Sequence, residues 1–232
     1  MASTQPLVLV PGLLCSARLY TPQIEALWPR GPVMVAEHRR DAEVGAIAAR
    51  ILSEAPPRFA LAGLSMGGYI AFAMMRLAPE RIDRLALLDT SARPDLPEQS
   101  AAREKFIAMA QVGKLAEVVE TLTPRFLHRS RHNDAALKQT VRDMASDTGV
   151  EAFVRQQRAI LSRPDSRPLL ATIECPTLVL VGEGDELTPP DLAKEIASGI
   201  SGASLTVVSE CGHLSTLEKP EAVNAALNRW LS

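Results

Sequence analysis

Short apolar runs recur along the chain, and each of them ends in turn residues. A helical pattern follows most of these runs, which is typical of parallel strands joined by crossover helices. The apolar runs predict six strands, at residues 7–10, 33–36, 59–62, 85–88, 178–181 and 205–208. Helices are predicted at residues 42–54, 65–78, 190–198 and 220–230. This alternation predicts an α/β fold built on a doubly wound, mostly parallel six-stranded sheet.

One stretch of the chain breaks this rhythm. Residues 93–169 carry apolar side chains at helical spacings but no convincing strand. Prolines mark both edges of the stretch, at Pro94 and Pro97 and again at Pro164 and Pro168, and proline disfavours helix in the residue before it. We therefore expect a helical insertion at 93–169 in a core formed by residues 1–92 and 170–232.

Composition is typical of a soluble globular protein. The 232 residues fit one domain, or one domain with a large insertion, and 47% hydrophobic with 22% charged residues excludes intrinsic disorder. A net charge of −2 without a long run of like charges argues against a nucleic-acid partner. The apolar run at 7–10 is too short for a signal peptide or a membrane span, so we expect a cytoplasmic protein without a membrane partner.

The cysteines give no sign of a structural cross-link. Cys15, Cys175 and Cys211 form no C-x-x-C pair, so neither a disulfide framework nor a zinc ribbon is predicted. A metal site built from Cys175, Cys211 and His213 lacks the ligand spacing of zinc sites. We therefore expect neither a metal nor another cofactor.

The most specific motif follows the third predicted strand, as Gly63-Leu64-Ser65-Met66-Gly67. A G-x-S-x-G turn between a strand and a helix holds its serine in a strained conformation, which the glycines permit. The hydroxyl then lies at a helix N-terminus, where free N–H groups and the helix dipole favour negative charge. Ser65 is therefore the candidate nucleophile, and the alternative is that it only caps the helix.

A serine nucleophile needs a base, and the chain has four histidines. His38 lies in a basic stretch after the second predicted strand. His128 and His132 lie among arginines of the insertion, which indicates solvated or lid residues. His213 follows the last strand on a glycine-bearing loop, at the edge of the sheet where ligands bind in doubly wound folds. We take His213 as the candidate base, with a structural histidine as the alternative.

The acid that orients the base is expected at another strand end. The loop after the fifth predicted strand carries Glu183, Asp185 and Glu186 between turn residues. An aspartate accepts a hydrogen bond from histidine Nδ1–H and stabilises the imidazolium, and the glycines on both sides of Glu183 allow the bend that turns Asp185 inward. Asp185 is the candidate acid. Glu183 and Glu186 are the local alternatives, and Asp89, after the fourth strand, is the distant one.

An acyl-transfer site also needs two donors for the oxyanion of its tetrahedral intermediate. The Met66 N–H directly follows the nucleophile, and the loop after the first strand offers a second backbone N–H, that of Leu13. Gly12 allows close approach at this point. The alternative is that this loop is an ordinary turn at the end of a strand.

Taken together, these motifs resemble the α/β-hydrolase superfamily, of the esterase and lactonase type with a helical cap. The resemblance spans the whole chain and includes the order Ser, Asp, His. It implies a sheet ordered 4-3-5-6-7-8 in the family's numbering, because the chain begins at what resembles the third strand. It also implies that the insertion forms the cap after the family's sixth strand. Pro11 departs from the histidine that many relatives carry before the oxyanion-loop glycine, so the support of that loop stays open.

The resemblance implies a cofactor-independent serine hydrolase for a small ester, thioester or lactone, of the carboxylesterase or enol-lactonase type. In this interpretation Ser65, His213 and Asp185 form the triad, and Leu13 and Met66 hold the oxyanion. Two alternatives stay open: a carbon–carbon bond hydrolase or lyase with the same triad, and a small-molecule receptor or signalling protein with little turnover. The insertion carries 13 Lys and Arg against 10 Asp and Glu, which favours a substrate with a carboxylate.

Overall fold

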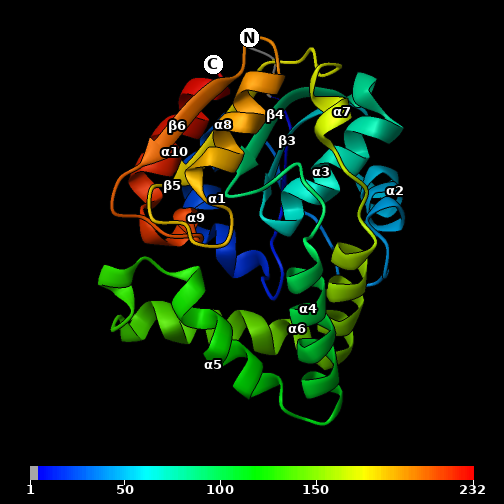
Figure 1. Cartoon of the computed structure of the whole chain (residues 1–232). Helices are drawn as coiled ribbons and strands as arrows, with labels where there is room; N and C mark the ends of the chain where they lie inside the picture. Colours follow the sequence, from blue (N-terminus) through cyan, green and yellow to red (C-terminus); the bar gives the residue numbers. More distant parts are fainter. Residues whose placement is uncertain (1–4) are drawn as a thin grey trace.

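A six-stranded parallel sheet runs through the centre of the molecule (Figure 1). The computed structural model describes residues 5–232, so residues 1–4 of the predicted core lie outside the described part. The strands are β1 (Leu7–Val10), β2 (Val33–Val35), β3 (Phe59–Leu64), β4 (Ile82–Leu88), β5 (Thr177–Gly182) and β6 (Ser204–Val208). Every neighbouring pair is parallel, in the order β2-β1-β3-β4-β5-β6. This is the order that the resemblance implies when β1 is counted as the family's third strand.

Helices cover both faces of the sheet. They are α1 (Thr21–Leu27), α2 (Val44–Glu54), α3 (Met66–Leu77), α7 (Arg167–Leu170), α8 (Pro190–Gly199), α9 (Ser215–Glu218) and α10 (Pro220–Trp230). Short 3₁₀ turns occupy Ala17–Tyr20, Trp28–Arg30, Pro79–Arg81 and Arg129–Arg131. The apolar sides of α2, α3 and α8 pack on one face, and those of α1 and α10 pack on the other. The predicted α/β class and the six strands are therefore confirmed.

The strands are apolar throughout because both of their faces are buried. Successive side chains of a strand point to opposite faces, and β1 illustrates this directly. Leu7 and Leu9 belong to the cluster beneath α1 and α10, whereas Val8 and Val10 belong to the cluster beneath α2 and α3. The two clusters hold the sheet rigid, so that the loops at its carboxyl edge start from fixed points.

The insertion consists of three longer helices grouped below the sheet (Figure 1). They are α4 (Pro97–Gln111), α5 (Leu115–Phe126) and α6 (Ala135–Leu161). Gly149 interrupts α6 with φ 75° and ψ 170°, a backbone conformation that is essentially restricted to glycine. All three helices fall within the predicted insertion, and the exact boundaries at 93 and 169 stay a prediction.

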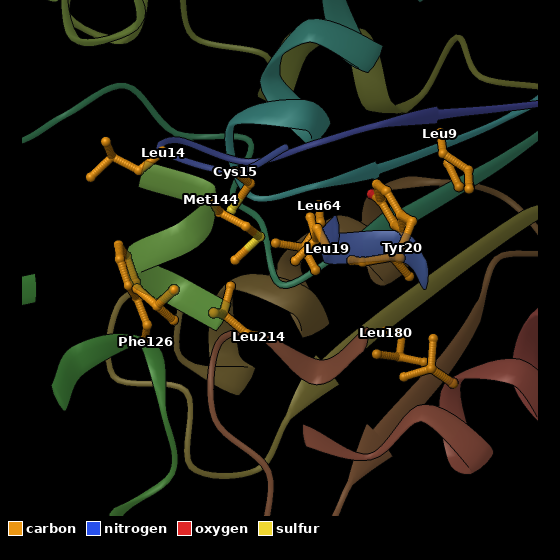
Figure 2. Close-up of a cluster of buried hydrophobic side chains, with 14 of the residues drawn as sticks. Leu9, Leu14, Cys15, Leu19, Tyr20, Leu64, Phe126, Met144, Leu180 and Leu214 are labelled. Carbon is orange, nitrogen blue, oxygen red and sulfur yellow. The ribbon is translucent and has the colours of Figure 1, made fainter. Parts of the chain in front are cut away.

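The helical cap shares a hydrophobic cluster with the sheet rather than lying loosely on it. Figure 2 shows Phe126 and Met144 of the cap beside Leu14, Leu64 and Leu214 of the core. All five side chains are buried. Because this cluster is continuous, it holds the cap in one position against the ends of the strands. Among residues 5–232, no helix combines the length and the apolar composition that crossing a membrane requires.

Candidate active site

Ser65 lies on the sharp turn between β3 and α3, as its motif predicts. Its backbone has φ 56° and ψ −115°, which is a strained conformation for a residue with a Cβ. Hydrogen bonds fix the turn on both sides: the Ser65 N–H donates to Leu88 O at 2.9 Å, and the Thr90 hydroxyl donates to Ser65 O at 2.8 Å. The surrounding structure thus maintains the strain that exposes the serine hydroxyl.

The glycines of the motif are required by contact rather than by their dihedral angles. A Cβ on Gly67 would overlap the carbonyl oxygen of Val10, and a Cβ on Gly63 would overlap that of Gly67. Gly68, which the motif does not include, has Thr90 against the place of its Cβ. The first turn of α3 can therefore approach β1 and β4 only because side chains are absent there.

Three side chains from different strand ends form one chain of hydrogen bonds. His213 Nε2 lies 2.8 Å from Ser65 Oγ, and His213 Nδ1 lies 2.8 Å from Asp185 Oδ2. Thr188 donates to the same carboxylate through its hydroxyl at 2.7 Å and its backbone N–H at 3.0 Å. These bonds hold Asp185 toward the imidazole. In the neutral ring Nδ1–H donates to Asp185 and Nε2 accepts the serine proton.

The electrostatics of this chain favour charge on the imidazole. Burial by itself raises the pKa of Asp185 and lowers that of His213, and each is almost fully buried. Their mutual attraction and hydrogen bond outweigh burial, so the pKa of Asp185 lies below its usual value and that of His213 lies above 6.5. An imidazolium formed during a reaction is therefore stabilised where it stands.

The competing carboxylates lie elsewhere. Asp89 is fully buried and accepts from the Gly182 N–H at 2.9 Å and from the Ser215 hydroxyl at 2.5 Å. Burial and the nearby charge of Asp185 raise the pKa of Asp89 to about 8. Glu183 and Glu186 are exposed. Of the four candidate acids, only Asp185 bonds to the imidazole.

The predicted oxyanion donors flank the serine. Leu13 lies on the β1 loop and lines the same cavity as Ser65, while Met66 begins α3 directly after it. Within residues 5–232, neither the Leu13 N–H nor the Met66 N–H has a protein acceptor. Gly12 packs closely against the turn that carries Ser65, because a Cβ on Gly12 would stand 3.3 Å from Leu64 O and 3.4 Å from Ser65 Cβ. Two unpaired donors are therefore available beside Ser65.

His38 and Gln156 support the loop after β1 that carries Leu13, and the sequence predicts neither contact. The buried His38 Nε2 lies 3.0 Å from Gly12 O and 3.0 Å from Gln156 Nε2, and Gln156 Oε1 accepts from the Leu14 N–H at 3.1 Å. Burial lowers the pKa of His38 to about 4, so the ring is neutral near pH 7. The available signal was the position of His38 after a strand, at the carboxyl edge. These two side chains supply support that Pro11 does not.

The cap also contacts the loop that carries His213. The Phe126 carbonyl accepts from the His213 N–H at 3.1 Å, and its ring stacks on the imidazole with centroids 6.2 Å apart. Glu218 joins the two regions, because its carboxylate accepts from the His128 N–H at 2.8 Å and the Gly212 N–H at 2.9 Å. His128 therefore packs beside the loop that carries Gly212 and His213, and it does not line the cavity.

A cavity of about 220 Å³ lies between the strand ends and the cap. Ser65, Leu13 and His213 line it from the core. Its apolar cap wall includes Phe106, Leu122, Phe126 and Ile160, and its polar wall includes Arg103 and Gln157. Cys15 also lines the cavity, but burial raises the pKa of its thiol to about 12. In the described part of the chain, no cluster of three or more His, Cys, Asp or Glu side chains is arranged for a metal ion.

Comparison with known proteins shows which family the chain resembles. The model of the alpha/beta hydrolase family matches residues 7–226. The pimeloyl-[acyl-carrier protein] methyl ester esterase of Neisseria meningitidis is 26% identical over 90% of this chain and 84% of its own length. A thermophilic esterase from Thermogutta terrifontis superposes with a TM-score of 0.89 at 30% identity, over 98% of this chain and 89% of that one.

An enol-lactonase from Burkholderia xenovorans LB400 has the same fold, with a TM-score of 0.88 at 24% identity, over 98% of this chain and 91% of that one. The match of the family model covers nearly the whole chain. The protein therefore belongs to the α/β-hydrolase family.

Proposed function

We propose that the protein is a serine hydrolase that cleaves a small ester, thioester or lactone through an acyl-enzyme. The observation that carries the proposal is the hydrogen-bond chain from Asp185 through His213 to Ser65 at the bottom of the cavity. A buried carboxylate, an imidazole and a serine in this order can activate the hydroxyl as a nucleophile. The esterases among the similar proteins support the same class of reaction.

In the first half of the proposed reaction, Ser65 Oγ attacks the carbonyl carbon of the substrate. His213 Nε2 takes the serine proton, and Asp185 stabilises the imidazolium. The N–H groups of Leu13 and Met66 donate to the carbonyl oxygen as it becomes an oxyanion. His213 then returns the proton to the leaving group and Ser65 is left acylated. The leaving group of an ester or thioester departs as an alcohol or a thiol, whereas that of a lactone stays attached to the acyl chain.

In the second half, water hydrolyses the acyl-enzyme. His213 removes a proton from the water, hydroxide adds to the acyl carbon, and the same two N–H groups stabilise the second oxyanion. The proton returns to Ser65 Oγ as the acid product leaves. Every proton transfer uses groups of this chain, so the scheme requires no cofactor.

Nitrophenyl esters of increasing acyl length test this proposal. We expect Ser65→Ala to lower kcat/KM by about 10⁴-fold or more, because members of a triad act as a unit, and to leave the fold intact. Ser162→Ala is the matched control, since Ser162 does not line the cavity, and it should keep the parental rate. Equal rates for Ser65→Ala and the parent would rule out the acyl-enzyme.

The same panel separates the alternative functions. A receptor with little turnover would bind small ligands in the cavity but release no nitrophenol from any ester. A carbon–carbon bond hydrolase would depend on Ser65 as well, so loss of activity in Ser65→Ala does not separate it from an esterase. The comparison substrate is a purified vinylogous 1,5-diketone acid, in which a carbon–carbon bond is cleaved. We expect kcat/KM to be higher on the esters than on this diketone.

A further inference from the structure

The polar wall of the cavity contains a buried donor without a partner. Gln157 is fully buried on α6 and lines the cavity. Its Oε1 accepts from Arg103 Nη1 at 2.9 Å, whereas its Nε2 has no hydrogen-bond partner among the described residues. Exchanging the two ends of the amide would place an NH₂ against the guanidinium, so the contact fixes its orientation. An unpaired buried amide is costly, and an acceptor brought by a ligand would satisfy it.

Two arginines and one aspartate surround this amide. Asp95 accepts from Arg103 Nε at 2.5 Å and from Arg163 Nη2 at 2.8 Å. Burial opposes the charge of Asp95, but these two arginines keep its pKa below the usual value. One carboxylate thus balances one of these two guanidinium groups, and the other positive charge remains unbalanced. The exposed Arg125, for which no ion pair is found among residues 5–232, also lines the cavity and makes it more positive.

The arginines differ in what they have left to donate. Arg163 makes four hydrogen bonds, to the carbonyls of Arg93 and Ile160 and to Asp95, and its guanidinium lies over the Tyr69 ring at 4.2 Å. Arg103 makes three, to Asp95 and Gln157, so more of its five-donor fork is free. Of these two arginines, Arg103 is therefore the better placed to meet a ligand.

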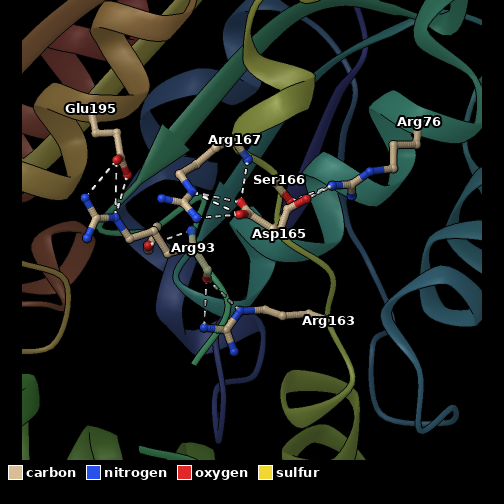
Figure 3. Close-up of polar contacts among 8 residues, drawn as sticks. Arg76, Arg93, Arg163, Asp165, Ser166, Arg167 and Glu195 are labelled. Atoms are coloured by element: carbon tan, nitrogen blue, oxygen red, sulfur yellow. Dashed lines mark hydrogen bonds and ion pairs between the residues drawn. The ribbon is translucent and has the colours of Figure 1, made fainter. Parts of the chain in front are cut away.

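Arg93 also lines the cavity, but its charge is directed away from it. Figure 3 shows its guanidinium on Glu195, at 2.8 Å, while its carbonyl accepts from Arg163. This ion pair leaves Arg103 and Gln157 as the adjoining donors where α4 meets α6, apart from the exposed Arg125 of α5.

From these contacts we propose that Arg103 and Gln157 form a subsite for a carboxylate, so that the substrate is an ester, thioester or lactone carrying a second, anionic carboxyl group. The inference rests on the proposed function, because the same cavity holds Ser65. A negative charge matches the guanidinium that Asp95 leaves unbalanced, and a planar carboxylate suits a guanidinium fork beside an amide N–H. The apolar cap wall contacts the chain between the two carboxyl groups.

Paired esters test the subsite directly. Each pair consists of the 4-nitrophenyl monoester of glutaric or adipic acid, with its free carboxylate, and the neutral isostere in which that carboxylate is a carboxamide. We expect the parent to prefer the carboxylate in kcat/KM by about 10- to 100-fold, the range of a charge-assisted hydrogen bond in a buried site. A parent with no preference in either pair would overturn the subsite.

Two substitutions assign the preference to residues. Gln157→Glu keeps the size and the contact with Arg103 but replaces the free donor by a charged acceptor, so the preference should fall at least tenfold. Arg103→Gln should reduce it as strongly. Rates on the carboxamide esters should change far less in both variants. Arg142→Gln removes the same charge from an exposed pair with Glu120 outside the cavity, and it should keep the parental preference. Equal losses on both esters of a pair would indicate a structural role and would overturn the proposal.

A binding measurement separates the subsite from the proposed function. Ser65→Ala is titrated calorimetrically with monomethyl adipate and with its neutral carboxamide analogue, neither of which needs to react. We expect the carboxylate to bind at least tenfold more tightly, and Gln157→Glu in the same background to abolish the difference. If no ester is hydrolysed but this difference is found, the proposed function fails and the subsite stands. If esters are hydrolysed without it, the subsite fails alone.

Discussion

The two walls of the cavity are built in different ways. On the core side, Ser65, Asp185 and His213 each follow a strand, and short loops hold them within hydrogen-bond distance of one another. On the cap side, Arg103 and Gln157 lie on α4 and α6 and meet because the two helices pack together. The core wall is positioned by strand ends, and the cap wall is positioned by helix packing.

This difference separates the reacting groups from the groups that contact the rest of a ligand. A change at Arg103 or Gln157 alters the shape and charge of the cavity without removing a hydrogen bond to Ser65, Asp185 or His213. A change at the Ser65 turn alters the proposed nucleophile for every ligand. Functional groups on rigid elements with tight supporting contacts are held most accurately, so we expect the core wall to determine the rate and the cap wall to determine the choice of substrate.

The largest loss of activity is expected for a substitution within the core wall. Asp185→Asn should lower kcat by about 10⁴-fold with much of the binding retained, because an amide favours the wrong imidazole tautomer. Asp89→Asn should cost far less activity, since Asp89 bonds to Gly182 and Ser215 rather than to His213. Steady-state kinetics of both variants on one nitrophenyl ester measure the contrast.

Glu183→Gln is the control for charge on the same loop, because Glu183 is exposed, and it should remain near the parental rate. If Asp89→Asn cripples turnover while Asp185→Asn stays active, then the acid belongs to the preceding strand. The assignment of Asp185 would then be wrong.

An intermediate effect is expected where the two walls meet. Gln156 of the cap binds the Leu14 N–H and lies beside His38, so Gln156→Leu releases one side of the oxyanion loop. Because a displacement of about 1 Å at a reacting centre can cost about 10²-fold, kcat should fall by roughly 10- to 100-fold with little change in KM.

Gln139→Leu is the matched control, since Gln139 is an exposed residue of α6. A rise in KM at unchanged kcat in Gln156→Leu would show that Gln156 acts on binding and not on the loop. Thermal unfolding of both variants should confirm that neither loses the fold.

The core wall could be predicted from the sequence because its signals are local. The G-x-S-x-G motif, the glycine-rich loop around Asp185 and the loop of His213 each follow an apolar run, and parallel strands bring their carboxyl ends to one edge. The apolar runs also predicted the six strands, although β3 extends to Leu64 and β4 begins at Ile82.

The cap wall could not be predicted in this way. Arg103 and Gln157 are 54 positions apart, and each sits in an ordinary helical pattern that is equally typical of a solvated surface. His38 lies in a basic stretch of the sequence, yet it is buried against Gly12. These contacts depend on how α4, α6 and the β1 loop pack in three dimensions, which hydrophobic periodicity does not specify.

The smallest effect concerns pH, and it sharpens the comparison within the core wall. His213 must be neutral to accept the serine proton, so kcat/KM should rise with pH through the pKa of His213 in the free enzyme. Burial lowers this pKa, but the charge and the hydrogen bond of Asp185 raise it above 6.5. The midpoint of the rise should therefore lie above pH 6.5 in the parent.

In Asp185→Asn the strongest opposing charge is lost while burial remains, so the midpoint of the residual activity should move to lower pH. Rates across pH 5 to 9 on a neutral ester measure both midpoints without titration of the substrate. A parental midpoint below 6.5, or a midpoint that Asp185→Asn leaves in place, would mean that the charge of Asp185 does not control the imidazole.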